Sequence, residues 1–233
     1  YLQELIEKGV QNFVVSKIPQ DSQGKANFIQ VDNTLLALQQ FAAWHRSEFS
    51  FPVIGITGSN GKTIVKEWLN FLLSPDYHII RSPKSYNSQV GVPLSVLAIN
   101  EKHNLGIFES GISTVSEMEK LEKVVRPTIG VLTNIGTAHD EGFGSTDEKI
   151  IEKLKLFAHS DILIYQKNPS IDQFISQKSF SWSFDDKTAD VLISQEKLTD
   201  KTHLTVKYND SFLAIDIPFR DFASVENAVS CLM

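Results

Sequence analysis

Cysteine is almost absent from this chain: Cys231 is the only one among 233 residues. A single cysteine cannot form an internal disulfide, which excludes the small secreted domains that depend on disulfides and is typical of a reducing compartment. No apolar run approaches the roughly 20 residues that a membrane-spanning helix needs, and no signal-peptide pattern opens the chain. We therefore expect a cytoplasmic protein with no membrane insertion.

The chain also lacks an excess of positive charge. Its 22 lysines and arginines stand against 28 aspartates and glutamates, which gives a formal net charge of −6. Binding to nucleic acid therefore has no electrostatic support. Hydrophobic residues make up 42% and charged residues 21% of the chain, which is ordinary for a globular protein. The length suffices for one large domain, or for one domain and part of another.

Strand-like and helix-like segments alternate from Pro52 onward. This alternation predicts an α/β fold whose central sheet is mostly parallel and covered by helices on both faces. Ligands then bind beyond the carboxyl ends of the strands. The expected strands are 53–57, 77–81, 105–108, 129–133 and 161–165, and the expected helices are 63–73, 116–125 and 146–159. Short antiparallel strands are expected at 191–193, 203–206 and 212–217, and a last helix at 224–233.

The first fifty residues predict a smaller, partial α/β domain. The expected helices are 1–8 and 34–47, and the expected strands are 13–15 and 28–31. Asp32 or Asn33 can cap the second helix. Segment 47–51 is the expected boundary, which gives domains at 1–50 and 51–233. Because the chain begins with Tyr1 and its last helix stops without a cap, we expect a fragment of a longer protein.

One glycine-rich segment, Gly55–Thr63 (GITGSNGKT), carries the clearest functional signal. It follows an expected strand and leads into an expected helix, so backbone N–H groups and the positive end of a helix dipole converge where a phosphate would bind. Lys62 can contact the outer phosphates, and the Thr63 hydroxyl can ligate Mg2+. The common P-loop pattern has glycine at the position of Ile56, but the end of the motif fits fully. The alternative is a glycine-rich turn with an incidental lysine.

Three further loops are expected at the same edge of the sheet. Glu109 follows one strand, where a carboxylate can hold Mg2+ directly or through water; a helix-capping or surface glutamate is the alternative. Asn134 and His139 follow another strand, and the His139 imidazole could ligate a second metal ion or contact a phosphate. Segment 85–93 is polar at its start and ends in Gly-Val-Pro, which suggests a substrate loop before a short helix.

Together these motifs resemble the Mur ligases, the cytoplasmic enzymes that build the peptide of peptidoglycan. The resemblance covers residues 52–233 and is most specific from 53 to 157. The order of the motifs is most similar to that of the member that adds D-Ala-D-Ala to UDP-N-acetylmuramoyl-tripeptide. The residues that carry it are Thr57–Thr63, Asn87 with Gly91-Val92-Pro93, Glu109–Ser113 with Glu117-Met118, and Asn134 with Ala138-His139 and Glu141–Ser145.

The resemblance implies a reaction and its components. ATP phosphorylates the terminal carboxylate of the UDP-linked peptide, and the amine of D-Ala-D-Ala then attacks the acyl phosphate to form an amide. ATP and Mg2+ are the implied cofactors, and the tripeptide precursor and the dipeptide are the implied partners. Residues 1–50 then match the end of a UDP-substrate-binding domain, and the amine-delivering C-terminal domain is absent. Some members are also fused to an alanine racemase, a possible C-terminal domain of the parent chain.

The resemblance also implies the roles of individual residues. Lys153 matches a lysine that family members carry as a carbamate beside the second metal ion, with Lys155 as the competing assignment. The implied catalytic residues are Lys62, His139 and Lys153, and the implied metal-binding residues are Thr63, Glu109, His139 and Lys153. The implied nucleotide-binding residues are Thr57, Gly58, Ser59, Asn60, Gly61, Lys62, Thr63, Asn134 and Asn227, and the implied substrate-binding residues are Ser85, Asn87 and Ser88.

Some positions depart from the family pattern. Ser85 and Ser88 stand where asparagines are more usual, and Ala223-Ser224 replaces an expected His-Asn pair. Members that add lysine or diaminopimelate usually carry Asp-His-Leu-Asp where this chain has residues 138–141. Two other interpretations stay open: a relative that adds a single amino acid, and a nucleotide-binding P-loop module without catalysis.

Overall fold

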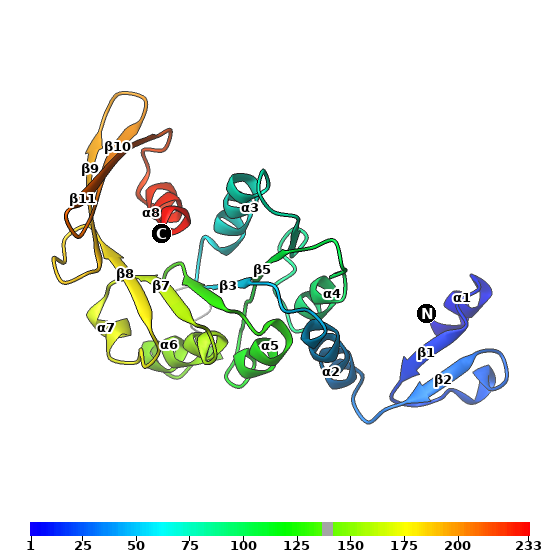
Figure 1. Ribbon diagram of the computed structural model, residues 1–233. Coiled ribbons are helices and arrows are strands. Elements are labelled where there is room, and N and C mark those ends of the chain that lie inside the picture. Colours follow the sequence, from blue (N-terminus) through cyan, green and yellow to red (C-terminus); the bar gives the residue numbers. More distant parts are fainter. Residues whose placement is uncertain (137–141) are drawn as a thin grey trace.

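The computed structural model describes residues 1–136 and 142–233. At its start, α1 (Leu2–Glu7), β1 (Asn12–Val15), the 3-10 turn η1 (Gln20–Ser22) and β2 (Asn27–Gln30) form a small unit. β1 and β2 pair in parallel, with Phe13 opposite Phe28 and their rings stacked at 5.6 Å. This unit lies apart from the rest of the chain, to which α2 (Thr34–Ser47) connects it (Figure 1).

Helix α2 belongs by its packing to the larger part of the molecule. Asn33 caps it, because the Asn33 side chain accepts a hydrogen bond from the amide of Leu36 at 2.9 Å. The helix packs against α4 (Gly91–Val96) and α5 (Met118–Val125), and Ala42 lies in the same buried cluster as Val53. The N-terminal unit that lies apart from the rest of the chain therefore ends before α2. The domain boundary at residues 50 and 51 stays a prediction.

Within the described residues, nine strands form one sheet in the order β11-β10-β9-β8-β7-β6-β3-β5-β4. Every pair from β4 to β9 is parallel, and the two pairs of β10 are antiparallel. The strands are β3 (Val53–Thr57), β4 (Ile79–Arg81), β5 (Leu105–Glu109), β6 (Ile129–Leu132), β7 (Ile162–Gln166), β8 (Ser179–Ser183), β9 (Val191–Lys197), β10 (Thr202–Tyr208) and β11 (Ser211–Ile217). The predicted α/β class with a mostly parallel sheet is confirmed.

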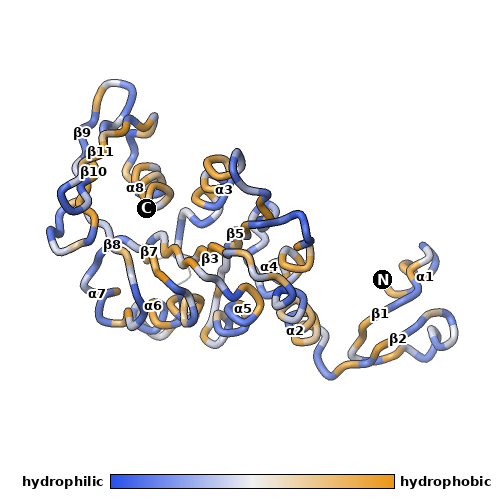
Figure 2. The backbone as a smooth tube through the Cα atoms, viewed as in Figure 1, coloured by the Kyte–Doolittle hydropathy of each residue, from blue (hydrophilic) through white to orange (hydrophobic). Residues whose placement is uncertain are grey.

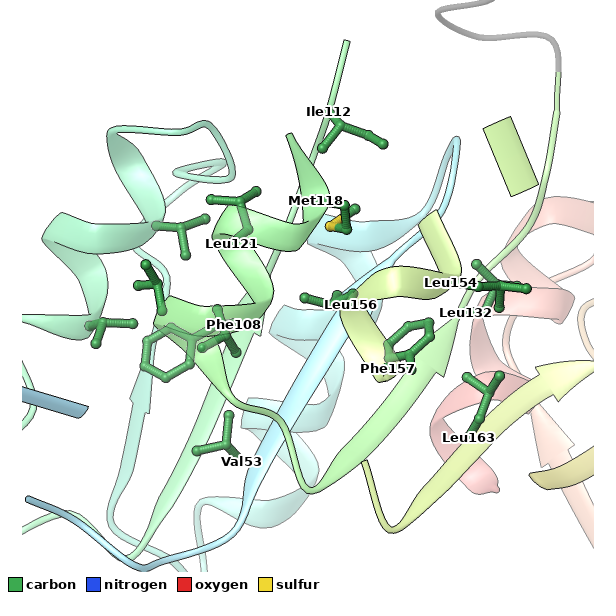
Figure 3. Packing of buried hydrophobic residues seen from close by; sticks show 14 of the residues in the cluster. Val53, Phe108, Ile112, Met118, Leu121, Leu132, Leu154, Leu156, Phe157 and Leu163 are labelled. Carbon is green, nitrogen blue, oxygen red and sulfur yellow. The ribbon is translucent and has the colours of Figure 1, made fainter. Parts of the chain in front are cut away.

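The parallel strands are buried on both faces, because successive side chains point to opposite sides. Val53, Phe108 and Leu132 pack on one side, under α5, α6 (Thr146–Leu154) and the 3-10 turn η3 (Lys155–Phe157) (Figure 3). Ile54, Ile107 and Val131 instead join the residues of α3 (Lys62–Leu73) on the opposite side. Strand β3 is accordingly coloured as mainly hydrophobic (Figure 2).

The antiparallel strands extend the sheet and pack against α8 (Phe222–Leu232). Trp182 on β8 is fully buried there. Trp68 of α3 stacks on Phe219 with 4.5 Å between ring centroids, which joins this extension to the helix that follows the glycine-rich loop. Two elements were not predicted, β8 and the short α7 (Pro169–Asp172).

None of the helices in the described part of the chain combines the length and the apolar composition needed to cross a membrane.

Candidate active site

The glycine-rich loop joins β3 to α3 at the carboxyl edge of the sheet, as predicted. Gly61 precedes α3 with φ of 81°, a left-handed conformation that favours glycine. A side chain at this position would collide with Oδ1 of Asn227 on α8. Asn227 is buried, so the structure places this predicted nucleotide-binding residue directly against the loop. The start of α3 and the middle of α8 are therefore in close contact at the site.

The loop that follows β6 holds the glycine-rich loop in place. The amide of Ser59 donates to the backbone oxygen of Asn134 at 2.8 Å, and the amide of Asn60 donates to Oδ1 of Asn134 at 3.0 Å. Thr133 donates through its hydroxyl to the backbone oxygen of Asn60 at 2.6 Å. Asn134 thus acts here as a support for the loop, because its side-chain oxygen is occupied by the Asn60 amide.

Two predicted lysines meet at one carbonyl of the loop. Nζ of Lys62 donates to the backbone oxygens of Gly58 at 2.9 Å and Ser59 at 3.3 Å. Nζ of Lys153, on α6, donates to the same Gly58 oxygen at 3.2 Å. Both ammonium groups therefore lie against the glycine-rich loop.

Lys153 is buried and Lys62 is half-buried, and this burial changes their titration. It lowers the pKa of Lys62 below its ordinary value, while the charge of Glu109 opposes this effect. Lys153 is only 1% exposed. Burial, together with the charges of Lys62 and Lys149, lowers the pKa of Lys153 to about 8. A lysine with this pKa is partly neutral near physiological pH and therefore nucleophilic.

The competing lysine, Lys155, lies in a different environment. Its side chain is 40% exposed and pairs with Oε2 of Glu152 at 2.5 Å. Its partner belongs to the preceding helix, α6, and not to the glycine-rich loop. The geometry therefore favours Lys153 over Lys155 as the lysine of the site.

Glu109 ends β5 beside the start of α3. It is fully buried, so the alternative of a surface glutamate does not hold. Its Oε2 accepts a hydrogen bond from the Thr63 hydroxyl at 2.8 Å, and Oε1 has no hydrogen-bond partner among residues 1–136 and 142–233. Burial raises the pKa of Glu109, whereas the Thr63 hydrogen bond and the charges of Lys66 and Lys62 lower it.

The Thr63–Glu109 pair fits a magnesium ion. The part of the chain that the structure describes contains no group of three or more histidine, cysteine, aspartate or glutamate side chains that could hold a metal. Mg2+ does not need one, because it binds with one or two protein oxygens and fills its other positions with phosphate oxygens and water. A free carboxylate oxygen next to a hydroxyl, at the mouth of a phosphate loop, meets that requirement. His139, predicted to help with a second metal ion, lies outside the described residues.

The predicted substrate loop, 85–93, lies beside the glycine-rich loop. Asn87 and residues 59–64 line a cavity of about 290 Å3. The backbone oxygen of Asn87 accepts a hydrogen bond from Gly111 at 2.8 Å, which joins this loop to the segment after Glu109. Ser88 has a local role, since its hydroxyl accepts from the amide of Gly91 at 3.1 Å at the start of α4. Ser85 is exposed.

A second cavity, of about 430 Å3, opens beside the first. Asn60 lines both cavities. The end of β6 and the loop after it, the end of β7, α6, the start of α7 and one residue of α8, Glu226, line the rest. Burial raises the pKa of Glu226. The two cavities thus meet at the glycine-rich loop, one near Asn87 and the other near α8.

Four residues at or beside the site were not predicted. Thr133 and Ser82 are buried residues at the ends of strands, and each binds a backbone group of the site. Lys66 and Lys149 are buried lysines on the helices that carry Lys62 and Lys153. The signal in the sequence was weak: each is a lysine one helical turn away from a predicted lysine. Local pattern alone could not show what these residues contact.

Comparison with known proteins adds an independent line of evidence. The family model described as the Mur ligase middle domain matches residues 56–233. A UDP-N-acetylmuramoyl-tripeptide–D-alanyl-D-alanine ligase of Rickettsia prowazekii is 32% identical over 237 residues, which cover 96% of this chain and 53% of the relative. The corresponding ligase of Bacillus subtilis is 29% identical over 100% of this chain and 51% of the relative. The chain thus spans about half the length of these curated relatives.

Solved structures give the same picture of the fold. A crystal structure of MurF from Acinetobacter baumannii superposes with a TM-score of 0.88 at 25% identity, covering 99% of this chain and 52% of that one. A MurF ligase from Thermotoga maritima, solved in complex with ADP, superposes with a TM-score of 0.86 at 22% identity, covering 99% of this chain and 55% of that one. The architecture of the present chain is therefore shared across these proteins.

Proposed function

The chain belongs to the Mur ligase family, and from this premise we propose that it is the ATP-binding core of the ligase that joins D-Ala-D-Ala to UDP-N-acetylmuramoyl-tripeptide in peptidoglycan synthesis. The observation that carries the proposal is the 2.8 Å hydrogen bond from Thr63 to the buried carboxylate of Glu109, beside two lysines that converge on Gly58. A module that only bound a nucleotide would not need a second lysine, Lys153, buried against this loop. The curated relatives of known name support the choice of substrates.

In this proposal the two cavities divide the nucleotide and the acceptor between them. The outer phosphates of ATP bind at residues 58–63, where loop amides and the dipole of α3 attract negative charge. The adenosine part occupies the cavity of about 430 Å3 between β6, β7 and α8, near Asn227. The terminal carboxylate of the tripeptide precursor approaches from the Asn87 side.

Thr63 and Glu109 would hold one Mg2+ when ATP binds. We assign His139 and the carbamate of Lys153 to a second ion. The ions supply positive charge that screens the phosphates from the approaching carboxylate. The burial of Lys153 supports the carbamate, because carbon dioxide reacts with a neutral amine and a lysine with a pKa of about 8 provides one. The carbamate of Lys153 is an anion. Lys62 then no longer has a buried positive charge beside it, and the free-energy cost of that repulsion is removed.

The chemistry has two steps. An oxygen of the tripeptide carboxylate attacks the γ-phosphorus of ATP, the bond from phosphorus to the ADP oxygen breaks, and an acyl phosphate forms. The amine of D-Ala-D-Ala then attacks the acyl carbon, phosphate leaves, and the amine loses a proton as the amide forms. Lys62 stabilises the charge that develops on the transferred phosphoryl group, which is the main contribution a protein makes to such a transfer. Because the reaction uses ATP and a UDP-linked precursor, we place it in the cytoplasm.

The test uses the full-length protein that contains this chain. Phosphate release is followed with ATP, Mg2+ and UDP-N-acetylmuramoyl-tripeptide, with and without D-Ala-D-Ala. The proposal expects release that depends on the dipeptide. Release with a single amino acid instead would assign the protein to another step of the family, and no release with any amine would favour a nucleotide-binding module.

A further inference from the structure

A buried lysine that the reaction above does not use lies one helical turn beyond Lys62. Lys66 is completely buried on α3. Its Nζ lies 3.1 Å from Oε1 of Glu67 and 4.0 Å from Oε1 of Glu109, and it also donates a hydrogen bond to the backbone oxygen of Lys84. The single ammonium group thus contacts the phosphate-loop helix, the end of β5 and the loop that follows β4.

Lys66 is well placed to orient Glu109. Oε2 of Glu109 is held by Thr63, whereas Oε1 has no hydrogen-bond partner in the described part of the chain. Among those residues, Lys66 is also the only cation within ion-pair distance of this carboxylate. Buried carboxylates are costly unless a charge balances them. Lys66 therefore balances the carboxylate and leaves Oε1 open to a further ligand.

The opposite contact of Lys66 fixes the substrate loop. Lys84 has φ of 49°, a left-handed conformation that is uncommon for a residue other than glycine. Its carbonyl accepts from Lys66, and only three residues later the backbone oxygen of Asn87 accepts from Gly111. Ser82, at the start of the same loop, accepts a hydrogen bond from the amide of Glu109 at 3.3 Å. The loop is thus attached at two points to residues 109–111 and at a third point to Lys66 of α3.

We propose that Lys66 is a positioning residue that couples the loop 82–91, which contains the start of the predicted substrate segment 85–93, to the Glu109 carboxylate. One ammonium group donates a hydrogen bond to the carbonyl of Lys84 and lies at ion-pair distance, 4.0 Å, from Oε1 of Glu109, so the loop that receives the acceptor and the carboxylate that receives Mg2+ keep one relative placement. Glu67 contributes less, because its side chain is 41% exposed and it also pairs with Arg81 at 3.1 Å. The inference rests on the proposed function for the identity of the acceptor, but not for the contacts themselves.

The test compares Lys66→Met with Lys102→Met in the full-length protein. Methionine keeps the length of the side chain and removes its charge, and Lys102 is an exposed lysine outside the site. We expect Lys66→Met to raise the KM for UDP-N-acetylmuramoyl-tripeptide about ten-fold or more, as the loss of a charged hydrogen bond does. The KM for D-Ala-D-Ala stays within about two-fold, and Lys102→Met leaves both values unchanged.

Two measurements do not depend on ligation. We expect Lys66→Met to raise the Mg2+ concentration needed for half-maximal ADP binding in calorimetry about ten-fold. We also expect faster hydrogen–deuterium exchange confined to the amides of 84–91 and Gly111. Faster exchange throughout the sheet would indicate a merely structural role and would overturn the proposal. So would unchanged Mg2+ dependence together with unchanged exchange in the loop.

If Lys66→Met fails to fold, Lys66→Arg decides. Arginine keeps the charge near Glu109 but cannot place one nitrogen between both partners, so we expect a raised acceptor KM with little change in Mg2+ dependence. Wild-type values for both would overturn the proposal. If the wild-type protein ligates nothing, the proposed function fails, and the exchange and Mg2+ measurements still decide the role of Lys66.

Discussion

At the scale of single residues, the site concentrates positive charge where folding alone would avoid it. Lys66, Lys149 and Lys153 are each no more than 1% exposed. Burying an ammonium group costs free energy unless a partner compensates it. Backbone carbonyls of Gly58, Gly136 and Lys84 compensate here, and Lys66 also has the carboxylates of Glu67 and Glu109 beside it. We infer that stability is given up locally so that charges are in place before the nucleotide arrives.

Lys62 provides the most direct test at this scale. Lys62→Ala in the full-length protein should lower kcat by about 10²–10³-fold, because it removes one preorganised charge at the transferred phosphoryl group. Initial rates of phosphate release with saturating substrates measure this change. Lys25→Ala, at an exposed position of the N-terminal unit, is the matched control. Near-normal turnover in Lys62→Ala would contradict the assignment of the loop.

Lys153 predicts a pH dependence of stability. Its pKa is about 8 in the folded chain against an ordinary 10.5, so between these values the unfolded chain binds more protons. The free energy of unfolding should therefore rise with pH from about 8 to 10.5, and the penalty is fully present below about pH 8. The shift corresponds to about 3 kcal/mol.

Urea unfolding of the wild type and Lys153→Met, in buffers free of bicarbonate, measures this difference. Relative to the variant, the wild type should gain stability across that window. Parallel curves for the two proteins would show that Lys153 titrates normally. The variant should also be inactive in the full-length protein, because methionine cannot form a carbamate.

At the scale of elements, the loop depends on a contact between α3 and α8. Gly61 and Gly24 both have left-handed backbones, with φ of 81° and 77°. A side chain at Gly24 meets nothing within 4 Å, whereas one at Gly61 meets Asn227. Gly24→Ala should lower the free energy of unfolding by about 1–2 kcal/mol, because only the left-handed backbone opposes the new side chain.

Gly61→Ala should lower the free energy of unfolding by roughly 1–3 kcal/mol more than Gly24→Ala does, because the new side chain overpacks against Asn227. It should also weaken ADP binding. Thermal unfolding and calorimetry on the two variants check both parts. Equal destabilisation of the two variants, with unchanged ADP affinity, would show that α8 does not press on the loop.

The bounds of the helices and strands show what the sequence could and could not predict. The periodic helix 34–47 and the buried strand 53–57 were predicted with the bounds they have, because local patterning determines them. The helix expected at 146–159 ends at Leu154, and a 3-10 turn follows that packs Phe157 against Gly130. Strand β8 was missed, although its serines alternate with Phe180 and Trp182 as in a half-buried strand; Ser181 is satisfied there by Asp190.

Within the site, the local motif predicted the phosphate loop, but not its supports. Thr133, Ser82 and Lys66 act on partners that are distant in the chain. Nothing in a window of neighbouring residues marks such partners, because the sheet order brings them together. The resemblance to a family supplied Lys153 and Asn227, which spacing alone would not have singled out.

At the scale of the whole molecule, the N-terminal unit is connected to the sheet mainly through α2 (Figure 1). The turn before α2 is exposed at Asp32 and Asn33, whereas α2 itself is packed on the core. Limited proteolysis should therefore cut near residues 31–33 first and leave a stable product that begins close to α2. Mass spectrometry of the early products identifies the site. First cleavage at 47–51 would instead support the boundary expected from the sequence.

The contacts of the glycine-rich loop also have a consequence for the order in which the chain is made. The loop is complete by residue 63, but its supports are Asn134, Lys153 and Asn227. A ribosome must therefore add more than 160 further residues before the loop meets the last of them. Nucleotide in the cell cannot stabilise an early nascent chain. Nucleotide binding would stabilise only a chain that has been synthesised through α8. ATP would therefore stabilise this part of the protein only after all of it has been made.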